Sequence, residues 1–361
     1  MKILLVDIMP LERATYLHSY LEVLKKSGVE YDVFSWDRKV CGEIRQKDNW
    51  YIFQQKCPSG LGKINKLKKL WPMYLFRRAL INQLKKNKYD RIITINTMTG
   101  MLISDFLFKY YKGKYIFDCR DYTYERIKAF KKRVNVMARN SAMTIISSRG
   151  FLEFIDNREN ILINHNISNI QDIKNVPSLN ANKINTIGFV GWVRYQNENI
   201  KLIEQIEKSS KYRVLYAGQI ADGCNLKQIC QKEKYQNVRF IGEFKNSDKG
   251  KIYQNIDIIN SLYGDSSLEV TTAVPNRYYD AMIYKKPIIA SKGTYLGKLV
   301  VKNKLGIAVD IMKDDLLFQL NRYIKSFDRD EFSSTCAKLL SQVIYEQNNF
   351  KKHVYEFCRG D

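Results

Sequence analysis

The chain has 361 residues, of which 45% are hydrophobic and 27% charged, and its formal net charge is +23 at pH 7. This length predicts two domains, because a single core rarely grows beyond about 250–300 residues. No apolar run reaches about 18 residues, so we expect no transmembrane helix, and the short apolar stretch at the start predicts a buried strand, not a signal peptide. The positive charge predicts an anionic partner: nucleic acid, an anionic membrane or a phosphorylated substrate.

Short apolar strands alternate with helical stretches through residues 1–166. A helix is expected over residues 11–26, with Gly28 at its end. The expected strands cover residues 3–6, 31–36, 91–95, 115–117, 143–146 and 161–163. Such alternation predicts an α/β fold with a parallel sheet and crossover helices.

The polar segment 167–184 interrupts this pattern and is predicted to be a linker. The alternation resumes in a second domain over residues 185–328, and residues 329–361 are predicted to form a helical tail that crosses back to the first domain. The expected strands of the second domain cover residues 186–190, 213–217, 238–241, 256–259 and 287–290, with helices at 199–208 and 226–234.

Charged residues gather directly after the expected strand 115–117. Asp118, Arg120, Asp121 and Glu125 fall within eight residues. Because open α/β sheets bind ligands at the carboxyl ends of their strands, we take Asp118, Arg120 and Asp121 as candidate catalytic residues. The alternative, a salt-bridge cluster at a turn, remains open.

The stretch 268–291 carries the clearest binding signal. Pro275 or Asn276 is expected to open a short helix, whose free N–H groups can bind an anion. Arg277 adds a positive charge in the first turn, and Asp280 could accept hydrogen bonds from a diol. Together these features suit a phosphate joined to a ribose, although an ordinary buried helix with a surface arginine would give the same pattern.

PNRYYDAMIYKKPIIAS at residues 275–291 resembles the PNK-x-x-E-Y-x-x-x-x-KPII-x-S segment of GT-B glycosyltransferases. The chain is most similar to family 4-like enzymes of bacterial capsular and other surface polysaccharides. The resemblance implies two doubly wound Rossmann-like domains facing a cleft, with the nucleotide sugar on the second domain. Its implied donor-binding residues are Gly191, Arg194, Gly218, Gly242, Thr272, Pro275, Asn276, Arg277 and Asp280.

Two further positions bear on the resemblance. Thr272 stands where many retaining members carry Glu, which leaves retention or inversion open. His165-Asn166 resembles the HN pair at the family's hinge, and we interpret His165 as structural.

The resemblance implies transfer of a hexose from a UDP- or GDP-sugar to a polyprenyl-diphosphate-linked saccharide. No cluster of metal ligands is apparent, so we expect no metal or other cofactor. The GxGxxG motif of a nicotinamide dehydrogenase is missing after the first strand. Two alternatives remain: a non-catalytic GT-B partner subunit, and a basic nucleic-acid-binding protein, which would lack any recognisable recognition module.

Residues 60–88 carry nine Lys or Arg and no acid, interleaved with apolar and aromatic residues. Such a basic amphipathic helix predicts docking on an anionic membrane, and thus a cytoplasmic protein peripheral to the inner face of the cell membrane. A solvated helix face is the alternative. Residues 1–170 carry a net charge of +15, against +8 for the rest of the chain. The predicted docking residues are Lys66, Lys68, Lys69, Trp71, Phe76, Arg77 and Arg78.

Overall fold

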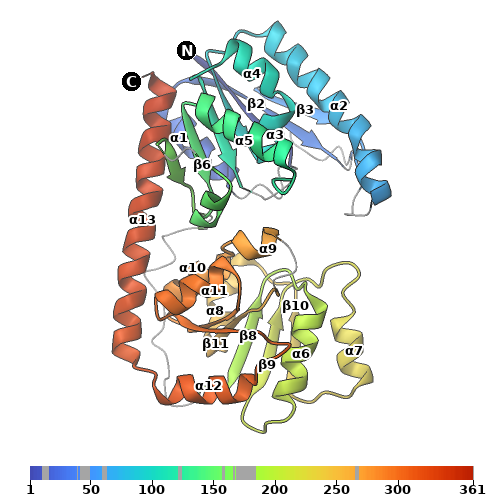
Figure 1. Cartoon of the computed structure of the whole chain (residues 1–361), viewed down its shortest axis with the longest axis vertical. Helices are drawn as coiled ribbons and strands as arrows, with labels where there is room; N and C mark the ends of the chain where they lie inside the picture. Colours follow the sequence, from blue (N-terminus) through green and yellow to red (C-terminus); the bar gives the residue numbers. More distant parts are fainter. Residues whose placement is uncertain are drawn as a thin grey trace. The chain divides into compact units, whose positions relative to one another are not determined.

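The chain divides into two compact units (Figure 1). Unit 1 comprises Met1–Ser168 and Tyr345–Asp361, and unit 2 comprises Asn169–Ile344. The computed structural model describes residues 1–9, 16–38, 40, 49–58, 63–120, 124–156, 159–165, 167, 184–264 and 268–360, without the side chains at 63–66 and 268. The predicted linker therefore lies almost entirely outside the described residues.

Unit 1 is built on a parallel seven-stranded sheet in the order β3-β2-β1-β4-β5-β6-β7. Its strands are β1 (Lys2–Asp7), β2 (Glu30–Asp37), β3 (Trp50–Gln54), β4 (Arg91–Ile95), β5 (Tyr115–Cys119), β6 (Met143–Ile146) and β7 (Ile161–Ile163). All but the edge strand β3 were expected from the sequence. The chain order reverses between β1 and β4, which is where doubly wound sheets open a binding crevice.

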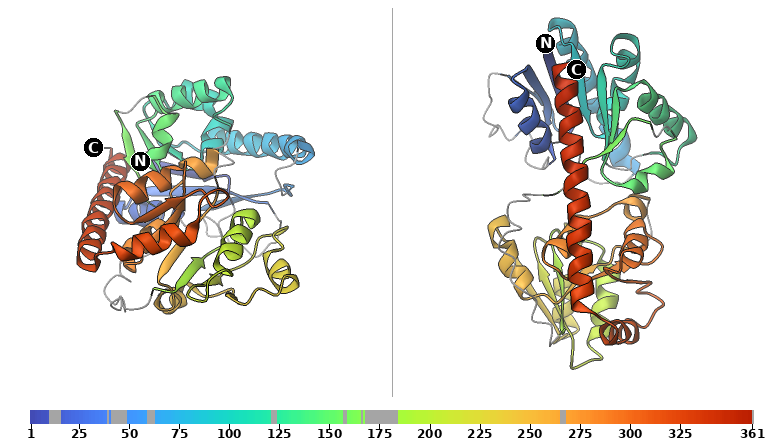
Figure 2. Two further views of the ribbon diagram at one scale, coloured as in Figure 1. Left: turned by 60° about the horizontal axis from the view of Figure 1, so that its bottom comes forward. Right: turned by 90° about the vertical axis from the view of Figure 1, so that its left-hand side faces the viewer.

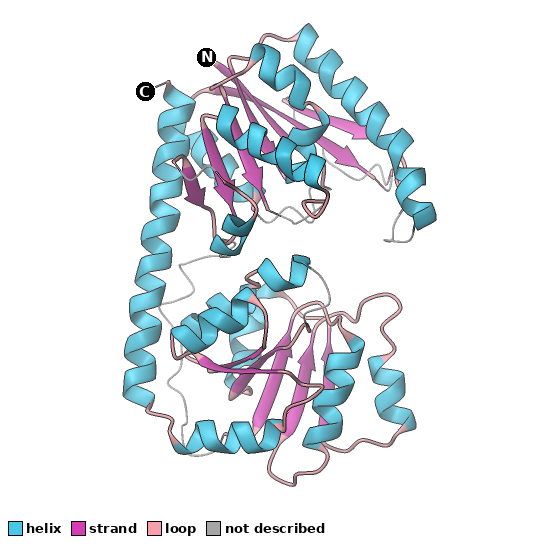
Figure 3. Ribbon diagram, viewed as in Figure 1, coloured by secondary structure: helices cyan, strands magenta, loops and turns pink. Residues whose placement is uncertain are grey.

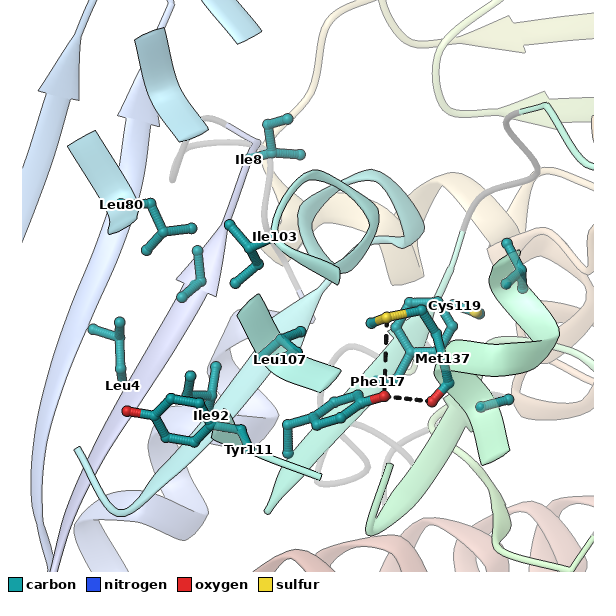
Figure 4. Close-up of a cluster of buried hydrophobic side chains, with 14 of the residues drawn as sticks. Leu4, Ile8, Leu80, Ile92, Ile103, Leu107, Tyr111, Phe117, Cys119 and Met137 are labelled. Carbon is teal, nitrogen blue, oxygen red and sulfur yellow. Dashed lines mark hydrogen bonds between the residues drawn. The ribbon is translucent and has the colours of Figure 1, made fainter. Parts of the chain in front are cut away.

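Helices cover both faces of this sheet. Alternate residues of β1 point to opposite faces: Leu4 and Val6 join one core cluster, and Ile3 and Leu5 join the other. Figure 4 shows part of the first cluster, to which Leu4, Leu80 and Leu107 belong. The helices are α1 (Leu17–Ser27), α2 (Lys63–Lys86), α3 (Thr97–Leu102), α4 (Ser104–Tyr110), α5 (Lys128–Asn140) and the short 3-10 helix η2 (Arg149–Glu153).

The helix α2 buries only part of its length. Phe76, Leu80 and Leu84 recur every four residues and are buried in the core, with the Phe76 ring stacked 5.2 Å from Trp36. The prediction that Phe76 faces a membrane is therefore wrong, because its side chain has no exposed surface. Among the helices of the described ranges, none is both long and apolar enough to cross a bilayer.

Unit 2 is built on a parallel six-stranded sheet, whose strands are magenta in Figure 3. The order of its strands is β10-β9-β8-β11-β12-β13. Its strands are β8 (Thr186–Val190), β9 (Arg213–Ala217), β10 (Val238–Gly242), β11 (Ile258–Ser261), β12 (Ile288–Ser291) and β13 (Gly306–Val309). Its helices are α6 (Gln196–Ile206), α7 (Leu226–Lys232), η4 (Asn246–Asp248), α8 (Lys249–Gln254), α9 (Leu268–Thr272), α10 (Asn276–Ile283), α11 (Tyr295–Lys302) and α12 (Leu316–Lys325). The reversal of strand order lies between β8 and β11.

The last helix, α13 (Arg329–Arg359), contributes to both units. Its first part belongs to unit 2, where Cys336 is fully buried. From Tyr345 onward it belongs to unit 1, where Phe350 meets Tyr20 of α1 edge to face at 5.2 Å. Figure 2 shows α13 as one continuous helix. The core of unit 1 therefore uses residues from both ends of the described chain.

Candidate functional site

Three predicted glycines meet at one edge of the second sheet. Gly191 follows β8, and its N–H donates to Ala217 at 2.8 Å, while the N–H of Gly218 donates to Gly242 at 2.7 Å. A Cβ added to Gly218 would stand 2.0 Å from the Gly191 carbonyl oxygen, and Gly218 has a φ of +132°. Only glycine fits at position 218, because the backbone of Gly191 lies directly against it.

Arg277 lies directly beside this glycine edge. Its Nη1 donates to the Val190 carbonyl at 2.8 Å, and the guanidinium stacks 3.8 Å from the Phe189 ring. The residue is 6% exposed, and burial lowers its pKa to about 10. Its Nε is buried and donates to no partner in the described part of the chain. The sequence placed Arg277 in the first turn of α10, where it is found with Pro275 as the residue before the helix.

Arg194 lies in the loop between β8 and α6, with its guanidinium near the rings of Trp192 and Tyr195 at 5.1 and 5.2 Å. It is half-buried, and its Nε is a second buried donor with no partner among the described residues. Tyr195 takes a left-handed conformation with a φ of +59°, which few residues other than glycine adopt. This loop is therefore held in a specific, costly shape.

Asn199 holds the Arg194 loop in place, and the sequence analysis missed it. The side chain is fully buried, and its Nδ2 donates to the carbonyls of Arg194 and Tyr195 at 2.7 and 2.9 Å. Its Oδ1 accepts from Tyr216 on β9 at 2.8 Å and from Asn260 on β11 at 3.0 Å. Asn199 thus ties the loop to both neighbouring strands.

Asp280 is buried at 4% exposure, and both of its carboxylate oxygens are engaged within unit 2. Lys249 lies 2.6 Å from Oδ1, and Tyr253 donates to Oδ2 at 2.8 Å. Burial first, and then the Asp280 charge, raise the pKa of Tyr253 well above its ordinary value. Asp280 therefore joins α10 to α8, and its predicted contact with a diol stays a prediction.

The remaining donor residues lie around α9 and α10. Thr272 ends α9 and is 1% exposed. Asn276 begins α10 and is exposed. The structure thus brings Gly191, Gly218, Gly242, Arg194 and Arg277 to one edge of unit 2, and their role in donor binding stays a prediction.

In unit 1, Asp118 and Arg120 form a buried pair at the end of β5. Asp118 Oδ2 accepts from Tyr20 at 2.6 Å and from Arg120 Nε at 3.1 Å. Arg120 stacks 4.2 Å from the ring of Tyr16. These contacts match the salt-bridge interpretation, and a catalytic role for the pair stays a prediction. Asp121 lies outside the described residues.

Asp7, at the end of β1, belongs to the same group, and the sequence analysis did not select it. Its Oδ1 accepts from the Met9 N–H at 2.9 Å and from Asn96 Nδ2 at 2.7 Å. Burial raises its pKa to about 7. The one signal in the sequence is an acidic residue that directly follows an aliphatic strand.

His165 connects β7 to the last helix. Its Nε2 lies 2.8 Å from Glu346 Oε2, and its backbone N–H donates to Gln347 at 2.8 Å. Burial alone would raise the pKa of Glu346, but hydrogen bonds from His165 and Arg149 lower it to about 2. These contacts agree with the structural interpretation of His165. Asn166 lies outside the described residues.

No family model matches the sequence, and no curated protein matches it. Similar folds occur among solved structures. Anabaena HepE in complex with UDP aligns over 98% of this chain and 99% of its own, at 15% identity and a TM-score of 0.69. Sucrose-phosphate synthase from Thermosynechococcus elongatus aligns over 98% and 96%, at 14% identity and 0.68. The lipopolysaccharide outer core galactosyltransferase WaaB, in its apo form, aligns over 98% and 99%, at 16% identity and 0.62. The chain therefore has the GT-B fold, with two Rossmann-like units, that its sequence predicted.

Proposed function

We propose that the protein is a glycosyltransferase that uses a nucleotide diphosphate sugar as donor. The observation that carries the proposal is the convergence of Arg194 and Arg277 on the glycine edge of unit 2. Each guanidinium keeps a buried Nε that donates to nothing in the described chain. Buried donors are normally paired, so these two favour a ligand rich in acceptor oxygens.

The charge balance supports an anionic ligand. The pKa of Arg277 is lowered by burial first, and the nearby positive charge of Arg194 adds to this effect. A diphosphate between the two arginines would relieve their repulsion and accept from their free donors. The same contacts would stabilise the charge that develops on the leaving diphosphate during transfer.

UDP-sugars are the first donors to examine, because HepE, which shares the fold, has been solved with UDP and with UDP-glucose. We expect one of UDP-glucose, UDP-galactose, UDP-N-acetylglucosamine or GDP-mannose to raise the unfolding temperature, since a ligand of the folded state alone stabilises it. UDP should compete with the active sugar nucleotide in calorimetry. Absence of binding by every nucleotide diphosphate at millimolar concentration would contradict the proposal.

We further propose that the acceptor is a polyprenyl-diphosphate-linked saccharide of surface-polysaccharide assembly, reached at an anionic membrane. The support comes from an exposed face on the first turns of α2. Its apolar members recur three or four residues apart, so they share one side of the helix. They are Leu67, Leu70, Trp71 and Tyr74, at 69%, 61%, 64% and 50% exposure.

Basic residues flank these apolar side chains: Lys68 and Arg78 are exposed and Lys69 is half-buried. We call these four apolar and three basic residues the docking face. Arg77 is not part of it, because it pairs with Asp105 at 2.7 Å and donates to the Leu102 carbonyl. Incubation with a labelled donor and a membrane extract tests the acceptor: label should enter the lipid fraction, and label found only as free sugar would contradict this part.

A further inference from the structure

The side chain of Asn199 has no hydrogen-bonding capacity left for a ligand. An amide carries two N–H donors and an oxygen that accepts two hydrogen bonds. The two donors bind the carbonyls of Arg194 and Tyr195. The oxygen accepts from the Tyr216 hydroxyl and from the Asn260 amide. The side chain is also fully buried, so Asn199 can affect a ligand only through the residues that it holds.

The orientation of this amide is fixed by its partners. Backbone carbonyls only accept hydrogen bonds, so Nδ2 of Asn199 must face the loop and Oδ1 must face the strands. Asn260 therefore turns its own Nδ2 toward Asn199, and its Oδ1 accepts from the Leu262 N–H at 3.0 Å. Asn260 is fully buried as well. A buried network whose polar groups are paired in this way permits one arrangement of the chain around it.

The loop that Asn199 holds has a strained conformation. Tyr195 has a φ of +59° and a ψ of +60°, in the left-handed region. Aromatic residues are rarely found there, because the Cβ crowds the backbone. The side chain and the backbone N–H of Asn199 both donate to the Tyr195 carbonyl, at 2.9 and 3.1 Å. These contacts offset the strain, and because Arg194 directly precedes Tyr195, they also determine the direction in which Arg194 leaves the loop.

The same loop is connected to the surroundings of Arg277. The ring of Tyr195 lies 4.8 Å from the ring of Tyr263, and the Arg277 guanidinium lies 4.9 Å from the Tyr263 ring. Tyr263 follows β11, directly after the residue whose N–H binds Asn260. Asn199 and Asn260 thus hold the two loops on which the positions of both arginines depend.

We propose that Asn199 is a positioning residue of the donor site and fixes the direction of Arg194 before the diphosphate arrives, an inference that rests on the proposed glycosyltransferase function. Asn199 touches neither the donor nor the reacting atoms. Its contribution is that the loop does not have to become ordered on binding, and a site ordered in advance binds its ligand more tightly. The Nε of Arg194 is buried and donates to none of the described residues, as expected for a donor held ready for a ligand oxygen.

The alternative is that Asn199 stabilises unit 2 without affecting the donor. Gln205 is the matched control, because it is an amide on the same helix that binds a different loop. Its Nε2 donates to the carbonyls of Ile311 and Asp314, each at 3.1 Å, and its Oε1 accepts from the Leu316 N–H at 2.8 Å. None of these partners belongs to the predicted donor site. Truncation of either amide therefore removes comparable contacts, and only the loss of Asn199 would disturb that site.

Titration calorimetry on the full chain compares Asn199→Ala with Gln205→Ala. The probe is the nucleoside diphosphate of the donor that the binding screen selects, UDP or GDP. Alanine is used because aspartate would add a negative charge near the diphosphate. Asn199→Ala should weaken binding about tenfold, as the loss of one or two hydrogen bonds would, and Gln205→Ala should stay within about twofold of the wild type. Wild-type affinity in Asn199→Ala, or an equal loss in Gln205→Ala, would overturn the proposal.

A double-mutant cycle with Arg194→Ala tests whether Asn199 acts through Arg194. Without the arginine side chain, the direction of this loop no longer matters for the diphosphate. Adding Asn199→Ala to Arg194→Ala should therefore change the affinity by less than about twofold. A general defect of the fold would weaken binding by the same factor in both backgrounds. Equal factors would overturn the positioning role of Asn199 and leave the donor site in place.

The third measurement needs no variant, so it keeps the proposal testable if Asn199→Ala does not fold. Hydrogen exchange of the wild type, followed by mass spectrometry, should show peptide 191–198 protected without nucleotide and little changed on its addition. Fast exchange that slows only with nucleotide would show that the donor orders the loop, and would overturn the proposal. Failure of the wild type to bind any nucleoside diphosphate would instead refute the glycosyltransferase function itself.

Discussion

Asp7 is a buried acid whose ionisation opposes folding. Its pKa is raised from 3.8 to about 7, chiefly by burial. A raised pKa means that the folded state binds the proton more tightly than the unfolded state. The contribution of this protonation to the free energy of unfolding is therefore intact below about pH 4 and is lost as the pH rises through about 7. The full loss is about 4 kcal/mol, since one pKa unit corresponds to about 1.4 kcal/mol.

We therefore expect Asp7→Asn to unfold at a higher temperature than the wild type at about pH 8. This difference in unfolding temperature should become smaller toward about pH 5. Asparagine keeps the shape of the side chain and cannot ionise. Calorimetric unfolding of both proteins across this pH range measures the effect. An equal gap at both pH values would mean that Asp7 does not titrate there.

We expect Arg277 to contribute to donor binding through its hydrogen bonds as well as its charge. Arg277→Ala should weaken UDP binding about 10–100-fold, because hydrogen bonds to charged groups typically contribute about 1.5–3 kcal/mol. Arg239→Ala is the matched control, since it removes an exposed arginine from β10 of the same unit. Titration calorimetry with UDP compares the two, and equal affinities would remove Arg277 from the donor site.

The residues around α10 could be predicted from the sequence further than the contacts of Asp7 and Asn199. Pro275, Arg277 and Asp280 lie within six residues, so their spacing along one helix was visible in the sequence. Asp7 meets Asn96 across 89 positions, and Asn199 meets Asn260 across 61. Only the packing of strands and helices in the folded chain brings such residues together, and nothing local to either position indicates its partner.

The helix α2 illustrates the same limit for a whole element. The composition of residues 60–88 predicted a basic amphipathic helix. A basic helix forms, but its apolar residues do not gather on one face along its whole length, so the amphipathic part of the prediction is wrong for α2 as a whole. The sequence could not say which apolar residues the sheet would cover, because Phe76 is buried by Trp36 and Phe53 of distant strands. Most strands were expected from their aliphatic residues, whereas the edge strands β3 and β13 were missed.

The two parts of α2 should respond differently to truncation of one aromatic residue. Phe76→Ala should destabilise the protein by about 3–5 kcal/mol, because it leaves a cavity in the core of unit 1. Trp71→Ala should change stability by about 0.5 kcal/mol or less, since the side chain is 64% exposed. Urea unfolding of both variants measures this contrast. Similar losses would show that Trp71 packs against the protein in solution.

Membrane binding should depend on the docking face and not on the charge of the helix as a whole. Replacing Lys68, Lys69 and Arg78 by Glu should release the protein from anionic vesicles at low salt, since each base near such a surface contributes about 1 kcal/mol. Co-sedimentation measures the bound fraction.

The control reverses three bases at and just beyond the other end of α2. Lys85, Lys86 and Lys88 are all exposed, so their replacement by Glu changes the net charge equally. This control should still bind, and both variants should keep their affinity for UDP. If the docking-face variant and the control are released equally, net charge alone explains the binding. If neither the wild type nor the control binds anionic vesicles, the proposed membrane docking is excluded.

At the scale of the whole chain, the stability of unit 1 depends on residues of α13. Phe350 is fully buried and packs against Tyr20. Phe350→Ala should therefore destabilise unit 1 by about 3–5 kcal/mol. Hydrogen exchange followed by mass spectrometry should show faster exchange in peptides of β1, β4 and β5, with the strands of unit 2 unchanged. Uniform acceleration across both units would mean that they unfold as one.

The division of α13 between the units also determines which unit can complete its core first during synthesis on the ribosome. Domains usually fold in the order in which they are synthesised, at roughly 5–20 residues per second. Unit 1 cannot follow this rule, because Phe350, Val354 and Phe357 of its core emerge only after all of unit 2. The nascent first sheet must wait roughly 10–40 s with that face uncovered while unit 2 is made. Unit 2, although synthesised second, is therefore the first part of the chain able to complete its core.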